Sequence, residues 1–509
     1  MSLTLAAGSA GSADRAGSRT RVPTTAVVVA LTVLAAALRL YRLGFGYAHP
    51  VAEYDGSVYL SSALALVDGR LPYRDFVLVQ PPGITLLLSP VALLGKAVGS
   101  AQAMGVAKIL TGLAGAASVP LGAVVLRHRG PAAVTLGCAV LAVQGDAVAA
   151  AWTPLLEPWL VLCCLGAVAL AFDGDALAGN RRLAGAGVLL GFACTIKIWA
   201  VAPALVLLVL VVLARRARAV VGGLLLGGVV PLLPFLLAAP HDFVRQVVVA
   251  QLSRTAPTRT TLAFRLVHVF ATSPPDASEA GTAVWALLVA AALLVLALVA
   301  APWFVRPPRT ALERFATVTA VLVVVMLLAP DTFYWHYAAF STPFVVLAAL
   351  LRLPQGRGHR PAVALAGAAV LVLAVVVVQR YARPTHPYDN HVALQRAIPK
   401  GACVVSSTQG ATIAADRLTI GRACPLLFDP FGEILAATGG HAPTEAQLHR
   451  PAVIRVWLNA YRHADFVYLQ PRVTPQFPTD GPAQAYLRAH FRRLPLPGPG
   501  RLYERVRGR

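Results

Sequence analysis

The chain has 509 residues, of which 57% are hydrophobic and only 13% are charged, and its mean hydropathy is +0.68. Soluble globular proteins carry about 25% charged residues, so this composition argues against a water-soluble fold, and it excludes a disordered chain, a collagen and a small disulfide scaffold. The formal net charge of +22 would indicate a nucleic-acid partner in a soluble protein, whereas in a membrane protein cytoplasmic arginines orient the helices and require no nucleic acid.

Long apolar runs predict a polytopic α-helical membrane protein. A bilayer core about 30 Å thick is spanned by roughly 20 apolar residues of helix. Stretches without charge predict about eleven transmembrane helices, which lie near 24–43, 101–126, 133–150, 158–172, 183–198, 199–214, 219–239, 281–304, 315–331, 337–351 and 361–379. A further apolar stretch, 84–99, is interrupted by Pro90 and carries Lys96 near its end, which favours a re-entrant or interfacial helix.

The arginines predict the orientation of these helices. They lie in the tail 1–23 and in alternate loops, at Arg15, Arg19, Arg21, Arg127, Arg129, Arg181, Arg182, Arg215, Arg216, Arg218, Arg306, Arg309, Arg314, Arg352, Arg357 and Arg360. With eleven spans these segments share one side, which the positive-inside rule makes cytoplasmic. The basic tail 1–23 is then cytoplasmic, 24–380 is the transmembrane domain of a multi-pass cell-membrane protein, and 381–509 is extracytoplasmic. A transit peptide within 1–22 is the alternative.

The first external loop, 44–83, carries the first candidate catalytic acids, Glu53 and Asp55. They precede an amphipathic stretch, 56–67, that is expected to lie on the membrane surface. Carboxylates there could act as a general base for an acceptor hydroxyl or hold a divalent cation. Helix capping by Asp55, with the other charges solvated, is the simpler alternative.

A third acid, Glu157, lies in a short external loop between two prolines and two tryptophans. Aromatic anchoring at the interface explains Trp152 and Trp159 but not the carboxylate. An ionisable group at this depth is a functional candidate by default.

Basic and aromatic residues on the same side could bind a phosphate. Only four of the 44 basic residues are lysine, and Lys96, Lys108 and Lys197 lie near the outer face, where an ammonium suits a phosphate oxygen. Their alternative role is to reach toward lipid headgroups. The external loop 240–280 is rich in basic residues, His241, Arg245, Arg254, Arg259, Arg265 and His268, which could hold a phosphate or contact anionic lipid. His336, in an aromatic turn, could orient a substrate or belong to an aromatic belt.

Residues 381–509 lose the membrane pattern and predict a small α/β domain. Strands are expected at 403–407, 464–469 and 501–506, and a helix at 482–493. Cys403 and Cys424 are expected to form a disulfide, which an external domain permits, whereas Cys138, Cys163, Cys164 and Cys194 lie in predicted spans and are expected to pack. Walker, Rossmann, HExxH and CxxC patterns are absent from the sequence, so a cytosolic nucleotide site is not supported.

Together these motifs resemble the GT-C superfamily of membrane glycosyltransferases, most closely the bacterial branch with the aminoarabinose transferases and the protein O-mannosyltransferase-like enzymes. The resemblance covers roughly residues 24–350. It rests on Asp55–Tyr59, Gly69–Phe76, Gln80–Gly83, Leu156–Pro158, Thr195–Lys197, His336, Tyr337 and Pro343.

The resemblance implies transfer of a sugar from a polyprenyl-phosphate donor to a glycan, lipid or protein acceptor at the outer face of a bacterial membrane. It implies that Asp55 is the base or a metal-linked acid, that Glu157 is the second-loop acid, and that Lys108 and Lys197 neutralise the donor phosphate. Relatives often carry an Asp-Glu pair in the first loop, but here Gly56 follows Asp55. Glu53 could compensate, and binding of Mg²⁺ or Mn²⁺ by Asp55 and Glu53 is left open.

The sequence thus predicts a set of site residues for an inverting transfer. The catalytic acids are Asp55, Glu53 and Glu157. The donor phosphate is bound by Lys108, Lys197, Arg74, Arg254 and Arg259, and the substrates are positioned by Tyr59, Tyr73, Asp75, Gln80 and His336. A transporter or lipid flippase is the main rival, although no internal repeat is visible, and a non-catalytic sensor or assembly protein is a third reading. The excess positive charge indicates a phosphate-bearing lipid partner and not nucleic acid.

Overall fold

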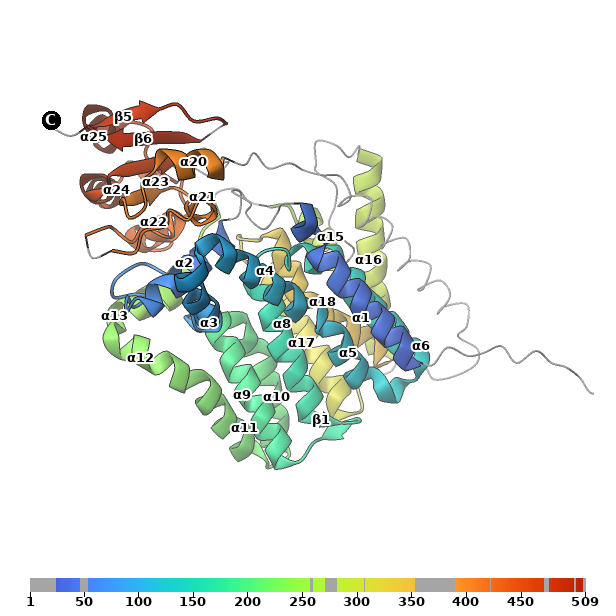
Figure 1. Cartoon of the computed structure of the whole chain (residues 1–509). Coiled ribbons are helices and arrows are strands. Elements are labelled where there is room, and N and C mark those ends of the chain that lie inside the picture. The colour runs from blue at the N-terminus through green and yellow to red at the C-terminus, as the bar shows by residue number, and fades with distance from the viewer. Residues whose placement is uncertain are drawn as a thin grey trace, which may run out of the picture.

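The computed structural model describes residues 24–45, 54–256, 260–270, 282–305, 307–352, 390–421, 423–470, 476–498 and 500–506. Figure 1 shows a bundle of helices with a smaller mixed α/β unit, coloured orange to red, at one end. We call residues 390–506 the tail unit. The predicted span 361–379 and the predicted site residues Glu53 and Arg259 lie outside the described residues.

The first part of the bundle matches the apolar runs closely. Its helices are α1 (Thr24–Leu40), η1 (Tyr41–Phe45), α2 (Asp55–Val67), α3 (Gly83–Val98), α4 (Ser100–Ala116), α5 (Ser118–Leu126), η2 (Arg127–Arg129), α6 (Pro131–Val143), α7 (Gly145–Ala149), α8 (Leu156–Ala171) and α9 (Asn180–Ile196). The stretch 84–99, expected as a re-entrant or interfacial helix, forms α3 with Pro90 inside it.

The second part of the bundle is more interrupted. It consists of η3 (Ile198–Ala200), α10 (Val201–Leu213), α11 (Ala217–Leu224), the π-turn η4 (Leu225–Val229), α12 (Val230–Ala238), α13 (Pro240–Val244), the π-turn η5 (Arg245–Val249), α14 (Ala250–Leu252), α15 (Leu262–Phe270), α16 (Thr282–Val305), α17 (Ala311–Leu328), η6 (Trp335–Tyr337) and α18 (Ala338–Leu350).

Four helical segments among the described residues are long and apolar enough to cross a membrane: 24–43, 100–129, 217–238 and 311–328. Several predicted spans are present as shorter apolar helices, including Pro131–Val143, Leu156–Ala171 and Ile198–Leu213. Outward-facing side chains such as Leu205, Leu226 and Val325 remain exposed, as contact with lipid tails requires.

The stretch 133–150, expected as one helix, is broken at Gln144. The backbone of Gln144 is extended, and its side chain accepts a hydrogen bond from the amide of Ala147 at 2.6 Å, which starts α7 as a new helix. The break leaves the carbonyls of Leu141 and Ala142 without helical partners, and the buried guanidinium of Arg39 donates to both at 3.0 and 2.9 Å. A buried arginine in α1 thus provides hydrogen bonds to the carbonyl groups at the end of α6.

Glycines bring α9 against α11 and η4 at backbone contact. A Cβ atom at Gly223 would lie 2.2 Å from the carbonyl oxygen of Ala184, and one at Gly227 would lie 2.0 Å from that of Val188. On α9, Cβ atoms at Gly187 and Gly191 would lie 2.5 and 2.6 Å from backbone oxygens of the same segment. Small residues spaced four apart allow this close packing between membrane helices.

The tail unit contains a four-stranded sheet in the order β3-β4-β6-β5. Its elements are α20 (His391–Ala397), β3 (Val404–Ser406), α21 (Gln409–Ala414), α22 (Pro430–Thr438), α23 (Glu445–Leu448), α24 (Pro451–His463), β4 (Phe466–Leu469), α25 (Gly481–His490), β5 (Phe491–Leu494) and β6 (Arg501–Arg505). Strand β3 runs parallel to β4, and the other pairs are antiparallel. The three expected strands are present, but the helix expected at 482–493 ends at His490 because Phe491–Leu494 pairs with β6 as an additional strand.

The expected disulfide between Cys403 and Cys424 is present, with Cα atoms 5.4 Å apart and a sequence separation of 21 residues. In the chain-entropy model, a cross-link closing a loop of this size stabilises the fold by about 3 kcal/mol. We therefore expect the Cys403→Ser, Cys424→Ser double variant to show a lower apparent Tm than the parent, and reductant to lower only the parent's Tm. Alkylation of both residues in the native protein without reductant would contradict the pairing.

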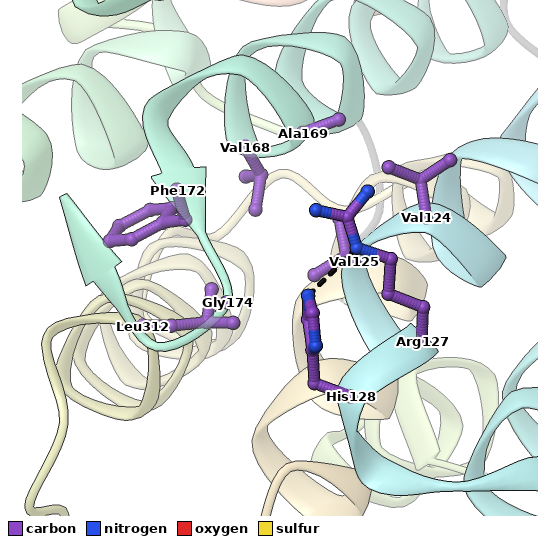
Figure 2. A pocket seen from close by; sticks show the side chains of 9 residues that line it. All are labelled: Val124, Val125, Arg127, His128, Val168, Ala169, Phe172, Gly174 and Leu312. Carbon is purple, nitrogen blue, oxygen red and sulfur yellow. Dashed lines mark hydrogen bonds between the residues drawn. The ribbon is translucent and has the colours of Figure 1, made fainter. Parts of the chain in front are cut away.

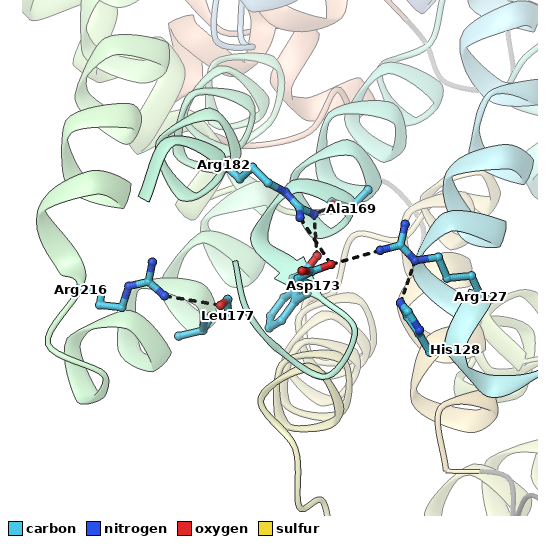
Figure 3. A network of polar contacts seen from close by, with 8 residues as sticks. Arg127, His128, Ala169, Asp173, Leu177, Arg182 and Arg216 are labelled. Carbon is cyan, nitrogen blue, oxygen red and sulfur yellow. Dashed lines mark hydrogen bonds and ion pairs between the residues drawn. The ribbon is translucent and has the colours of Figure 1, made fainter. Parts of the chain in front are cut away.

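The end of the bundle away from the tail unit collects arginines from three of the loops expected to be cytoplasmic. Figure 3 shows Asp173, in the short β1 (Phe172–Asp173) and β2 (Ala176–Leu177) hairpin, between Arg127 at 3.2 Å and Arg182 at 3.6 Å. Arg216 donates to the Leu177 carbonyl there. These loops therefore lie side by side, as a common membrane face requires.

A small pocket opens at this same end, lined by residues that include Arg127, His128, Phe172 and Leu312 (Figure 2). Helix α8 connects Phe172 with Glu157, and at 1.5 Å per residue these two residues are about 22 Å apart along its axis. The pocket is therefore separate from the acidic residues that the sequence singled out.

Candidate active site

A buried acid at the start of α8 is held by two basic side chains. Glu157 is fully buried in the first turn of α8. The Lys197 ammonium lies 2.7 Å from its Oε1 atom, and Nδ1 of His336 lies 3.1 Å from its Oε2 atom. The three residues come from α8, from the turn between α9 and η3, and from η6. The bundle thus assembles three of the predicted site residues from distant parts of the sequence.

Aromatic rings enclose the Lys197 ammonium. Its Nζ atom lies 3.5 Å from the ring centre of Trp199 and 4.1 Å from that of Tyr337. These two rings meet edge to face with centres 4.3 Å apart. Ring faces attract a cation more strongly where water is excluded, so the rings and Glu157 together hold this ammonium in place.

Asp55 lies at the start of α2 with its carboxylate uncommitted. The N-cap position is Tyr54, and no side chain caps the helix, so the alternative that Asp55 is a helix cap is wrong. Among the described residues the Asp55 carboxylate forms no hydrogen bond or ion pair. It lies within electrostatic range of Lys197 and Arg254. A carboxylate within electrostatic range of two cations, with no bonding partner among the described residues, is suited to accept a proton from a substrate.

Arg254 presents donors toward the same region. Its guanidinium lies between the rings of Tyr334 and Phe431, with centres at 5.4 and 5.1 Å, and Nη2 donates to the Tyr334 hydroxyl at 3.3 Å. Its Nε atom is buried without a hydrogen-bond partner among the described residues. A guanidinium fixed between rings with an unused donor can bind an anionic oxygen.

Gly56, which directly follows Asp55, lies where there is no space for a side chain. A Cβ atom at this position would lie 2.4 Å from Oγ1 of Thr153 and 2.9 Å from Cδ of Pro154. The first turn of α2 is therefore pressed against the loop before α8, which leaves no space for a second acid after Asp55.

This contact predicts a large effect of a single methyl group. We expect Gly56→Ala to displace the first turn of α2, with a loss of stability of about 1–3 kcal/mol for overpacking and a loss of transfer activity. The matched control is Gly222→Ala, in α11, where a Cβ atom would meet nothing within 4 Å. Parent-like activity and apparent Tm in Gly56→Ala would contradict the prediction.

Two other predicted residues lie on helices that border this cluster. Tyr59 is buried one turn after Asp55 on α2, within electrostatic range of Asp55 and Glu157. Lys108 is buried in α4, which packs against α8 and is tied to it by a 3.2 Å hydrogen bond from Trp159 Nε1 to Thr111 Oγ1.

The remaining residues of the first loop are bonded mainly within that loop. The Tyr73 hydroxyl donates to the Gln80 carbonyl at 2.7 Å, and exposed Arg74 pairs with Asp75 at 2.8 Å. Lys96, one of the three outer lysines, pairs with Asp68 at 2.7 Å. In the described structure these contacts shape the loop and do not join the group around Asp55.

Sequence reasoning missed the contribution of the tail unit. Asp429 and Phe431, at the start of α22, contact Tyr54 and Arg254, respectively. A second buried acid–histidine contact, between Asp146 and His268 at 2.9 Å, was also missed. Of Asp429, Phe431, Asp146 and His268, the sequence singled out only His268, as one of the basic residues of loop 240–280. It could not show these contacts because the partners lie more than 100 residues apart along the chain. Within the described ranges no three acidic, histidine or cysteine side chains converge on a possible metal site.

Residues 79–330 match the model of Glycosyltransferase family 87. The sequence matches none of the curated proteins with which it was compared. The fold is similar to that of ArnT from Cupriavidus metallidurans bound to undecaprenyl phosphate, with 13% identity, 95% of this chain and 98% of that chain covered, and a TM-score of 0.58. The apo state of that protein gives the same identity and score, with coverage of 95% and 97%.

The oligosaccharyltransferase of Archaeoglobus fulgidus in its apo form is similar at 14% identity, with 87% of this chain and 69% of that chain covered and a TM-score of 0.52. At such low identity these two likenesses concern the fold alone. The match to the family model is independent of them, because it rests on the amino-acid sequence. Just under half of this chain thus matches a glycosyltransferase family model, and the fold of this apolar helical bundle is similar to those of ArnT and the archaeal oligosaccharyltransferase.

Proposed function

We propose that this protein transfers a sugar from a polyprenyl-phosphate donor to an acceptor hydroxyl, with inversion at the anomeric carbon. The observation that carries this proposal is the Asp55 carboxylate, which forms no hydrogen bond or ion pair among the described residues and lies within electrostatic range of the cations Arg254 and Lys197. An acceptor needs a base on one side of the sugar, and the phosphate leaving group needs positive charge on the other.

The reaction follows from these groups. Asp55 takes the proton of the acceptor hydroxyl as its oxygen attacks the anomeric carbon. The bond from that carbon to the donor phosphate oxygen breaks, and polyprenyl phosphate leaves with the bonding electrons. Arg254 is suited to bind the departing phosphate directly, since its Nε atom has no protein partner among the described residues. Lys197 is already paired with Glu157, so it contributes positive electrostatic potential at the phosphate and holds the Trp199 ring in place.

The lipid nature of the donor is inferred from the comparisons and from the membrane bundle. ArnT, whose fold this chain shares, was solved with undecaprenyl phosphate. The expected orientation, with the N-terminus cytoplasmic and the tail unit outside, would place the site at the outer face of a cell membrane. The acceptor class proposed is a cell-envelope glycan, lipid or protein, and a role for Mg²⁺ or Mn²⁺ at Asp55 and Glu53 stays a prediction.

A donor panel tests this function. Purified protein is incubated with polyprenyl-phosphate sugars of different sugar identity together with envelope acceptors, and donor consumption and released polyprenyl phosphate are measured. We expect consumption of at least one donor by the parent and none by Asp55→Asn. Movement of a lipid-linked sugar across vesicle membranes without cleavage of the sugar–phosphate bond would favour a flippase instead.

A further inference from the structure

The tail unit contacts the residue that directly precedes Asp55. The hydroxyl of Tyr54 donates to Oδ1 of Asp429 at 2.7 Å and accepts from the backbone amide of Phe431 at 2.8 Å. Asp429 is the N-cap of α22, and the same oxygen accepts from the amide of Gly432 at 2.8 Å. Tyr54 is thus fixed to the first turn of a helix that lies 375 residues further along the chain.

The opposite end of α22 is tied to the segment that carries Arg254. The Thr255 amide donates to the Gly440 carbonyl at 3.1 Å, and the Thr255 hydroxyl accepts from the Ala442 amide at 3.1 Å. The Ser253 hydroxyl lies 2.9 Å from the Gly439 carbonyl and 2.6 Å from that of Val249, so its proton is shared between the two. These bonds bracket Arg254, whose guanidinium lies over the Phe431 ring. A single helix of the tail unit therefore contacts both elements that supply the proposed base and the proposed phosphate ligand.

The contact with Tyr54 is buried and charge-assisted. The Asp429 side chain is only 7% exposed, and burial raises the pKa of its carboxyl to about 6, so the group is ionised at pH 8. A hydroxyl bonded to a buried carboxylate is held more tightly than one bonded to a neutral acceptor. Because Tyr54 is the N-cap of α2 and Asp55 its first residue, the direction of Tyr54 sets where the Asp55 carboxylate lies.

We infer that α22 of the tail unit is a positioning element of the active site, which acts through the Asp429–Tyr54 hydrogen bond to hold the Asp55 carboxylate in line with the acceptor hydroxyl. The inference rests on the proposed role of Asp55 as the base. It assigns a task to the tail unit, for which the sequence offered none. Asp429 and Tyr54 are positioning residues, since each acts through Asp55 and not on the substrate.

The test uses the full-length protein at pH 8 and the donor-consumption assay with saturating substrates. We expect Tyr54→Phe to lower kcat about tenfold or more while the donor KM changes by less than about twofold, because a misplaced base weakens the transition state and not donor binding. Asp429→Ala is expected to do the same. Asp429→Asn keeps an oxygen acceptor for Tyr54 and for the Gly432 amide, so it is expected to restore most of kcat.

A double variant and a matched control separate positioning from a general loss of structure. Tyr54→Phe combined with Asp429→Ala should lower kcat no further than the larger of the two single losses, because each change already removes the hydrogen bond that joins these two side chains. Tyr468→Phe removes a hydroxyl that accepts from Asn390 inside the tail unit, and it should leave kcat unchanged. Parent-like kcat in Tyr54→Phe, additive losses in the double variant, or an equal loss in Tyr468→Phe would each overturn the inference.

These outcomes are distinguishable from failure of the proposed function. If Asp55→Asn retains activity, Asp55 is not the base and the proposed function fails, together with this inference. If Asp55→Asn is inactive while Tyr54→Phe and Asp429→Ala match the parent, the function holds and only the role of α22 is overturned.

Discussion

Replacing Asp55 by asparagine is expected to abolish sugar transfer while leaving the protein folded and inserted. The amide keeps the size of the side chain but cannot take a proton. General base catalysis contributes roughly 10²–10⁴-fold, so kcat should fall by about three orders of magnitude. Stability should change little, because the carboxylate has no hydrogen bond or ion pair to lose within the described structure.

The matched control for this variant is Asp68→Asn. Asp68 is also an acid of the loop predicted to be the first external one, and it pairs with Lys96 at 2.7 Å on a partly exposed surface. Such surface pairs contribute about 0–1 kcal/mol, so this variant should remain active. Donor consumption and the apparent Tm in detergent are measured for both. Near-normal turnover by Asp55→Asn would remove Asp55 from the mechanism.

Removing the Glu157 carboxylate should have the largest effect on stability. In Glu157→Gln the Lys197 ammonium stays buried without its countercharge, enclosed by Trp199 and Tyr337. Breaking a buried ion pair by removing one partner costs about 3–5 kcal/mol. We therefore expect a clear drop in apparent Tm, and a loss of activity because His336 also loses its acidic partner.

A second variant separates the stability cost of an unpaired buried charge from the loss of catalytic activity. The double variant Glu157→Gln, Lys197→Met removes both charges, so much of the stability should return, whereas transfer should stay impaired. Glu504→Gln is the control, because it breaks an exposed pair with Arg492 and should cost less than about 1 kcal/mol. A double variant as unstable as Glu157→Gln alone would show that the ion pair is not what stabilises this part of the bundle.

The sequence by itself determined that the chain is a helical membrane protein, and it identified most of the acids and cations of the site. Apolar runs reveal membrane helices because lipid requires about 20 apolar residues in a row. Glu157, Lys197 and His336 stand out because charged or polar groups are rare in such surroundings. The prediction that 381–509 lies outside the cytoplasm permitted a disulfide between Cys403 and Cys424, and the structure joins them.

Only the tertiary structure decided which of these residues meet. Tyr73, Arg74, Asp75 and Gln80 carry the motif of the first loop, yet their described hydrogen bonds stay within that loop, and the Tyr73 ring packs against Phe235 and Phe243 of α12 and α13. Sequence spacing could not show this, because a loop motif looks the same whether it binds substrate or shapes the loop. The break at Gln144 could not be predicted from the sequence either. The carbonyl groups that it leaves without helical partners are hydrogen-bonded by Arg39, which lies about 100 residues earlier in the chain.

The contacts of the tail unit show most clearly what the sequence alone could not predict. Asp429 lies in a stretch with no recognisable motif, and its partner Tyr54 is 375 residues earlier in the chain. Side-chain periodicity reports which face of an element is apolar, but not which distant element covers it. The sequence therefore indicated a basic membrane protein with acids in the loops that it predicts to be external. The contact between α22 and the start of α2, which completes the surroundings of Asp55, was decided by the tertiary structure alone.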